Sequence, residues 1–163
     1  MTRRAFLISV VAAVALAVSP TTFGQQADSG GTAAEAKAML TKAVAAVKAD
    51  RAKALDEFNT GAGGFKDRDL YVFCAQVSDG KIVAVLANPN AKSLIGTDNR
   101  TLKDSTGKPF GEELFAAGQK PEGQFTEVTY LFPRPGADKT PVPKVSLVTR
   151  VGDLGCGVGY YPK

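Results

Sequence analysis

The sequence contains no histidine and only two cysteines, Cys74 and Cys156. Without histidine, the chain lacks the side chain that most often acts as a general base near neutral pH and as a ligand of transition metals. Two cysteines are too few for a sulfur-ligated cluster or a structural zinc site. No paired carboxylates or activated nucleophile stand out either. We therefore expect no enzymatic activity, no metal and no cofactor.

Long apolar runs are also scarce. The uncharged run at residues 5–18 follows a short cationic start and precedes a polar stretch, which is typical of a secretory signal peptide. It is shorter than the roughly 20 residues of a membrane-spanning helix. We expect a signal peptide at residues 1–24, cleaved after Gly24 or, as a second choice, after Ala27. Its paired arginines leave both the twin-arginine and the general secretory route open. The mature protein is then expected to be periplasmic, with no membrane span.

Neither sign of charge is in large excess. The chain has 20 basic and 16 acidic residues, and removal of residues 1–24 leaves a net charge of about +2. No basic stripe is present, so nucleic acid is not an expected partner. About 139 residues remain after cleavage, which is enough for one compact domain and too few for two.

The hydrophobic pattern changes once along the chain. After a flexible leader at residues 25–33, apolar residues recur at helical spacing to about Asn59 and predict one long amphipathic helix. A period of two then predicts five strands, at residues 69–77, 81–88, 123–132, 144–151 and 154–161. The first two flank an Asp79-Gly80 turn, and a crossover with a short helix at 111–117 separates them from the rest. This order predicts an α+β domain with a largely antiparallel sheet.

The last predicted strand has one bare face, formed by Gly155, Gly157 and Gly159. Such a face indicates the close approach of another backbone or of a ligand, and both readings stay open. Cys156 lies on its other face. If this strand is the neighbour of the first, Cys156 meets Cys74, and we hypothesise a disulfide between them, since an exported protein can oxidise its thiols. Two buried thiols that act as small hydrophobes are the alternative.

Six short motifs occur in a fixed order in this region. They are Asp79-Gly80, Leu94-Ile95-Gly96, the Asp-x-x-Gly-Lys-x-Phe run from Asp104 to Phe110, Tyr130 with Pro133 and Pro135, Pro143-Lys144, and Gly157-Val158-Gly159-Tyr160. Together they resemble the single Cache domain, type 2, over about residues 34–163. Domains of this family are extracytoplasmic ligand-sensing modules of bacterial chemoreceptors and sensor kinases.

The resemblance implies a PAS-like fold. A central five-stranded antiparallel sheet would carry the long N-terminal helix on one face and a small ligand pocket on the other, with the first and last strands adjacent. Related domains often bind short organic acids, which makes a short carboxylate the implied ligand. Lys144 and Tyr130 are then candidate donors to it, and Tyr71 and Phe73 a candidate apolar wall. Core packing for the aromatic residues, and closure of a hairpin loop for Lys144, are the alternatives.

Members of this family are typically followed by a membrane helix and a signalling output, whereas this chain stops at Lys163. We therefore expect a stand-alone periplasmic domain that binds a small ligand and docks on a membrane receptor or sensor kinase. A structural or interaction module with the same fold and no functional pocket is the alternative.

Overall fold

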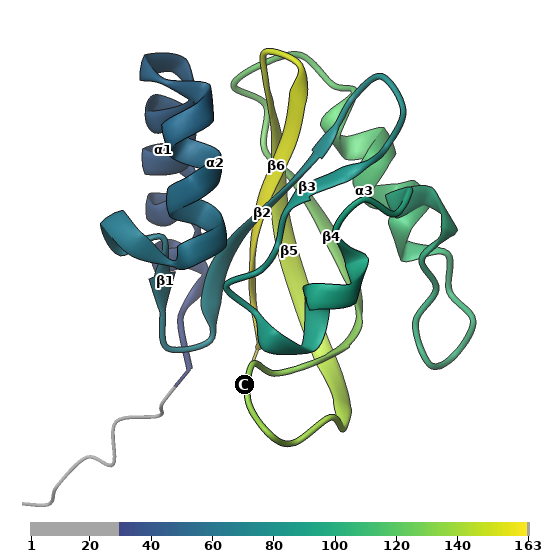
Figure 1. Ribbon diagram of the computed structural model, residues 1–163. Helices are drawn as coiled ribbons and strands as arrows, with labels where there is room; N and C mark the ends of the chain where they lie inside the picture. Colours follow the sequence, from purple (N-terminus) through teal and green to yellow (C-terminus); the bar gives the residue numbers. More distant parts are fainter. Residues whose placement is uncertain (1–29, 163) are drawn as a thin grey trace, which may run out of the picture.

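The computed structural model describes residues 30–162 (Figure 1). The signal peptide predicted at residues 1–24 lies outside this range, as does most of the predicted leader. Within the range, no helix combines the length and the apolar character that a membrane span requires.

The first helix, α1 (Ala33–Ala49), begins at a capping box. The hydroxyl of Thr32 accepts a hydrogen bond from the backbone N–H of Glu35, and the Glu35 carboxylate accepts one from the backbone N–H of Thr32. Two of the N–H groups left unpaired at the start of a helix are satisfied in this way. The start of the helix agrees with the sequence prediction.

The predicted long helix is divided in two at Asp50. This residue has an extended backbone (φ −157°, ψ 101°), and its carboxylate accepts the N–H of Lys53 at the start of α2 (Arg51–Thr60). An aspartate that caps a new helix competes with continuation of the old one, which explains the break. After it, α2 returns beside α1 (Figure 1), so that Lys42 Nζ donates to the carbonyl of Gly63 at 2.5 Å.

The sheet is antiparallel throughout. Its strands are β1 (Lys66–Asp67), β2 (Leu70–Gln76), β3 (Ile82–Ala84), β4 (Thr126–Pro133), β5 (Pro141–Val151) and β6 (Leu154–Tyr160). They lie in the order β1-β2-β6-β5-β4, with β3 also paired to β2. All five predicted strands are present, and β1 is an additional strand of two residues. The first and last predicted strands, β2 and β6, are neighbours, as the resemblance implied.

The connection from β3 to β4 covers one face of the sheet. It contains two 3-10 helices, η2 (Pro89–Leu94) and η3 (Asn99–Thr101), and the helix α3 (Phe110–Gly118). Asp104 fixes this connection to the sheet, because its carboxylate accepts the backbone N–H of Leu131 in β4. In Figure 1 the helices α1 and α2 lie on one side of the sheet and α3 on the other.

Alternation along the strands separates two cores. The core beneath α1 and α2 takes Val72 and Cys74 from β2 and Cys156 and Val158 from β6. On the other face, Tyr71 and its neighbours pack under the β3–β4 connection. Cys74 and Cys156 thus share one face of the sheet, as the hypothesised disulfide requires, and Tyr71 lies on the opposite face, where the resemblance implies the pocket.

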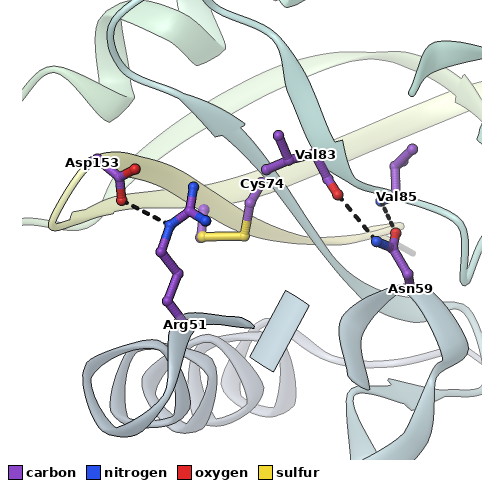
Figure 2. The surroundings of a disulfide bond; sticks show 7 residues. Arg51, Asn59, Cys74, Val83, Val85 and Asp153 are labelled. Carbon is purple, nitrogen blue, oxygen red and sulfur yellow. Dashed lines mark hydrogen bonds and ion pairs between the residues drawn. A yellow bond between two sulfur atoms is a disulfide. The ribbon is translucent and has the colours of Figure 1, made fainter. Parts of the chain in front are cut away.

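The hypothesised disulfide is present. Cys74 and Cys156 are register partners in β2 and β6, both are fully buried, and they form a disulfide that closes a separation of 82 residues. Figure 2 shows two links between α2 and the strands around this bond. Arg51 forms an ion pair with Asp153 at 3.1 Å. Asn59 Nδ2 donates to the carbonyl of Val83 in β3, and Asn59 Oδ1 accepts the N–H of Val85 just after that strand.

Candidate ligand site

Lys144 is the unusual residue on the face away from α1 and α2. It lies in β5 opposite Tyr130 of β4, and only 1% of its surface is exposed. Its Nζ donates a hydrogen bond to the hydroxyl of Tyr71 at 2.7 Å, the one hydrogen bond that this ammonium makes within residues 30–162. Asp69 is the acidic residue that interacts electrostatically with Lys144, but its carboxylate is already ion-paired with Arg134.

Four aromatic rings surround this ammonium. Nζ lies 4.3 Å from the ring centre of Tyr71, 5.1 Å from Phe132, 5.3 Å from Tyr161 and 6.0 Å from Tyr130. Ring faces attract a cation but do not replace its lost hydration. Burial accordingly lowers the pKa of Lys144 below the ordinary lysine value, while the nearby Tyr130 and Asp69 oppose that shift.

Two phenol hydroxyls lie beside the lysine. The Tyr71 oxygen accepts hydrogen bonds from both Asn88 Nδ2 (2.9 Å) and Lys144 Nζ (2.7 Å), so its own proton remains available to a further acceptor. The Tyr130 hydroxyl lies 2.8 Å from Ser146 Oγ. Burial raises the pKa of Tyr71 and of Tyr130, which keeps both phenols neutral and able to donate near neutral pH.

The glycines on one face of β6 leave space for the Lys144 side chain against the sheet. A Cβ at Gly159 would collide with Lys144 Cε, and one at Gly157 would collide with the Phe73 ring. At Gly155 a Cβ would lie 3.0 Å from the Cα of Gly118 in α3. Close helix–backbone packing therefore accounts for Gly155, whereas the other two glycines make room for side chains of the site.

A small cavity of about 40 Å³ lies next to this cluster. Tyr71, Phe73 and Tyr130, which were predicted as ligand residues, all line it. Lys144 is not part of its wall but contacts the lining residues Tyr71, Tyr130 and Phe132. The rest of the wall is mostly apolar, with Ile82, Leu102, Phe110, Leu114 and Val148 among its residues.

Several residues at the site were not predicted. Asn88 was read only as the end of a strand, yet it is fully buried and bonds Tyr71. Asp69 accepts the N–H of Gly31 at 2.7 Å and pairs with Arg134, whose guanidinium lies 4.5 Å from the ring centre of Tyr161. Their residue types are ordinary for turns and strand ends, so only the tertiary structure reveals these roles.

The strand order, with the helices on one face and a cavity on the other, defines a PAS-like α+β fold. The chain belongs to the single Cache domain 2 family, whose model matches residues 13–161. No curated protein sequence gives a significant match.

Several solved structures share this fold. A periplasmic sensor domain of a chemotaxis protein is 22% identical, with 80% of this chain and 90% of that chain covered and a TM-score of 0.58. A methyl-accepting chemotaxis protein from Vibrio parahaemolyticus RIMD 2210633 is 23% identical over 78% and 86% of the two chains (TM-score 0.59). A Cache chemosensory domain described in terms of carboxylic acid recognition is 24% identical over 80% and 88% (TM-score 0.56).

Proposed function

We propose that this protein is an extracytoplasmic sensory domain that binds a short organic acid at Lys144 without catalysing a reaction. The observation that carries the proposal is the fully buried Lys144 ammonium, which hydrogen-bonds a neutral phenol and has no carboxylate of its own within residues 30–162. The family supports a sensory role. One structure of the same fold is described as recognising a carboxylic acid, which supports the ligand class.

The physical reason lies in the cost of a buried charge. Removing an ammonium from water without a counterion costs more free energy than its contacts with aromatic ring faces offset. A bound anion beside Lys144 would compensate that cost. A carboxylate bound beside Nζ would receive a charge-assisted hydrogen bond from Lys144 and a second one from the Tyr71 hydroxyl, whose proton is not used in the hydrogen bonds with Asn88 and Lys144. Tyr130 is the proposed additional donor, and Phe73 the proposed wall for the ligand's alkyl chain.

The proposed setting is the periplasm, where the sensor would act on a membrane receptor or sensor kinase. Three observations support it: the signal-peptide pattern of residues 1–24, the buried disulfide, which is characteristic of oxidising compartments, and the fold shared with periplasmic chemotaxis sensors. Chemotaxis or related signal transduction is the function that follows.

The small size of the cavity favours a second candidate, an interaction module without a working pocket. Phe110 stacks on Tyr130 at 4.2 Å between ring centres. Phe132, whose ring centre lies 5.1 Å from Lys144 Nζ, packs edge-on against both rings. In this case the aromatic residues are core and Lys144 is a buried structural residue.

A thermal-shift and calorimetric screen of C2 to C4 carboxylic acids separates the two candidates. Under the ligand proposal, an acid at 100 times its dissociation constant adds about 2.7 kcal/mol of stability. Lys144→Met should abolish that gain, whereas Lys139→Met, which removes an exposed lysine of the same hairpin, should retain it. A flat response of the folded wild type to every acid would contradict the proposal and favour the interaction module.

A further inference from the structure

Tyr71 has a second buried polar partner besides Lys144, the side chain of Asn88. Asn88 caps η2, it is fully buried, and it is not part of the cavity wall. Its side-chain nitrogen donates to the Tyr71 hydroxyl at 2.9 Å, and its side-chain oxygen accepts the N–H of Asn90 at 3.0 Å. Both polar atoms of the amide are therefore used, and Asn88 can act on a ligand only through Tyr71.

The backbone fixes the direction in which the Asn88 amide points. The oxygen and nitrogen of an asparagine side chain are similar in size, so their hydrogen-bond partners decide which is which. On one side the partner is the backbone N–H of Asn90, which can only donate, so the oxygen must face it. The nitrogen then faces Tyr71. The Asn88 backbone is also held in place, because its N–H donates to the carbonyl of Val85 and its carbonyl accepts the N–H of Ala91.

This direction decides what the Tyr71 hydroxyl can offer to a ligand. A hydroxyl oxygen can accept two hydrogen bonds and can donate one. Asn88 Nδ2 and Lys144 Nζ supply both of the bonds that the oxygen accepts, at 2.9 and 2.7 Å. Only the phenol proton remains. A ligand beside Lys144 and Tyr71 therefore meets two hydrogen-bond donors, and neither of them can accept a hydrogen bond from the ligand.

A pair of donors favours one chemical class of ligand. A carboxylate carries only acceptors and a negative charge, so it can use both donors. A primary amide of the same size has one acceptor oxygen, but its NH2 group finds no acceptor at this pair, and an unpaired buried donor is unfavourable. The amide also brings no charge to compensate the buried ammonium. An acid and its amide are therefore the matched ligands that report on this pair.

We propose that Asn88 is a positioning residue that makes this site selective for carboxylates over neutral amides. It acts by donating to the Tyr71 oxygen, which leaves the phenol only its proton to offer to the ligand. The inference rests on the proposed function, because it takes the ligand to bind beside Lys144. With an acceptor at position 88, Tyr71 donates to that acceptor instead and the selectivity falls.

A change of one atom at position 88 tests this role. Asn88→Asp keeps the oxygen that accepts the N–H of Asn90, and aspartate caps a helix as well as asparagine does. The variant replaces the donor nitrogen with an acceptor oxygen, which takes up the Tyr71 proton. The matched control is Asn90→Asp. It adds the same charge two residues further on, at a side chain that bonds the Arg134 carbonyl and not Tyr71.

The experiment compares propanoate with propanamide by isothermal titration calorimetry on the full mature chain, at about pH 7, where carboxyl groups are ionised. The wild type should bind propanoate at least about tenfold more tightly than propanamide, as expected for a hydrogen bond that involves a charged group. In Asn88→Asp the affinity for propanoate should fall at least about tenfold, while the affinity for propanamide should change less than about threefold. Asn90→Asp should keep the wild-type preference.

Asn88→Ser is a second variant that keeps the test decisive if Asn88→Asp does not fold. Serine also caps helices, so the N–H of Asn90 keeps an acceptor. The shorter side chain does not reach the Tyr71 hydroxyl, which regains one acceptor position for an amide NH2 group. The preference for propanoate should therefore fall in this variant as well.

The outcomes distinguish this inference from the proposed function. If propanoate binds but the wild type shows no preference for it, the inference alone is overturned. A preference that persists in either folded Asn88 variant also overturns it. So does an equal loss in Asn90→Asp, because a charge near the site then explains the effect without Tyr71. If neither ligand binds to the folded wild type, the proposed function fails and the inference fails with it.

Discussion

Reduction of the Cys74–Cys156 disulfide should remove a large part of the stability of the protein. The bond joins residues separated by 82 positions, so it restricts most of the unfolded chain. The chain-entropy relation gives about 4.5 kcal/mol for a loop of this length, and measured values for such bonds are typically about 2–4 kcal/mol. Both cysteines are fully buried and lie directly opposite each other in β2 and β6, so the bond also joins two neighbouring strands inside the core.

The assay is urea denaturation with and without a reductant, with thiol content measured by mass after alkylation. The free energy of unfolding should fall by about 2–4 kcal/mol. The denaturant slope should rise, because the uncrosslinked chain exposes more surface when it unfolds. The Cys74→Ala/Cys156→Ala variant should be at least as unstable as the reduced wild type, since it also loses the buried sulfur atoms. A fully reduced protein whose free energy of unfolding falls by less than about 1 kcal/mol would contradict this prediction.

Three further predictions concern single residues. In the unliganded protein, burial lowers the pKa of Lys144, so the folded state releases this proton at a lower pH than the unfolded state does. The free energy of unfolding should therefore rise with pH up to the ordinary lysine pKa of 10.5. Lys144→Met should abolish this slope in a titration held below about pH 10, before the tyrosines of the unfolded chain ionise. Hydrogen bonds from Thr106 and from the backbone lower the pKa of Asp104 to about 2, so its contribution is complete above its ordinary value of 3.8 and is lost as the pH falls toward 2; Asp104→Asn should flatten this acid limb in a denaturation series. Gly159→Ala should displace Lys144, cost about 1–3 kcal/mol in urea denaturation, and abolish the thermal shift with short acids.

Much of the fold follows from short-range pattern. Alternation placed Cys74 and Tyr71 on opposite faces of one strand, and the Asp79-Gly80 turn marked the first hairpin. The adjacency of β2 and β6 is a long-range contact that the family resemblance implied and the strand pattern alone did not. Once that adjacency is known, the disulfide follows.

Other features depend on tertiary contacts that the pattern does not encode. Asp50 occurs in a run of good helix formers, and its role as a cap becomes visible only where α2 folds back onto α1. Asn99 lies in a polar tripeptide typical of an exposed loop, yet the hairpin turn and α3 enclose it. Lys144 was read as either a ligand residue or a loop residue, and its full burial depends on the space above Gly159.

The most direct test of the proposed function is a crystal structure of the protein grown with butanoate. We expect a carboxylate oxygen within hydrogen-bond distance, about 2.8 Å, of Lys144 Nζ, with the Tyr71 hydroxyl as a second donor. A structure at saturating butanoate in which the acid lies elsewhere, while Lys144 still bonds Tyr71 alone, would contradict it.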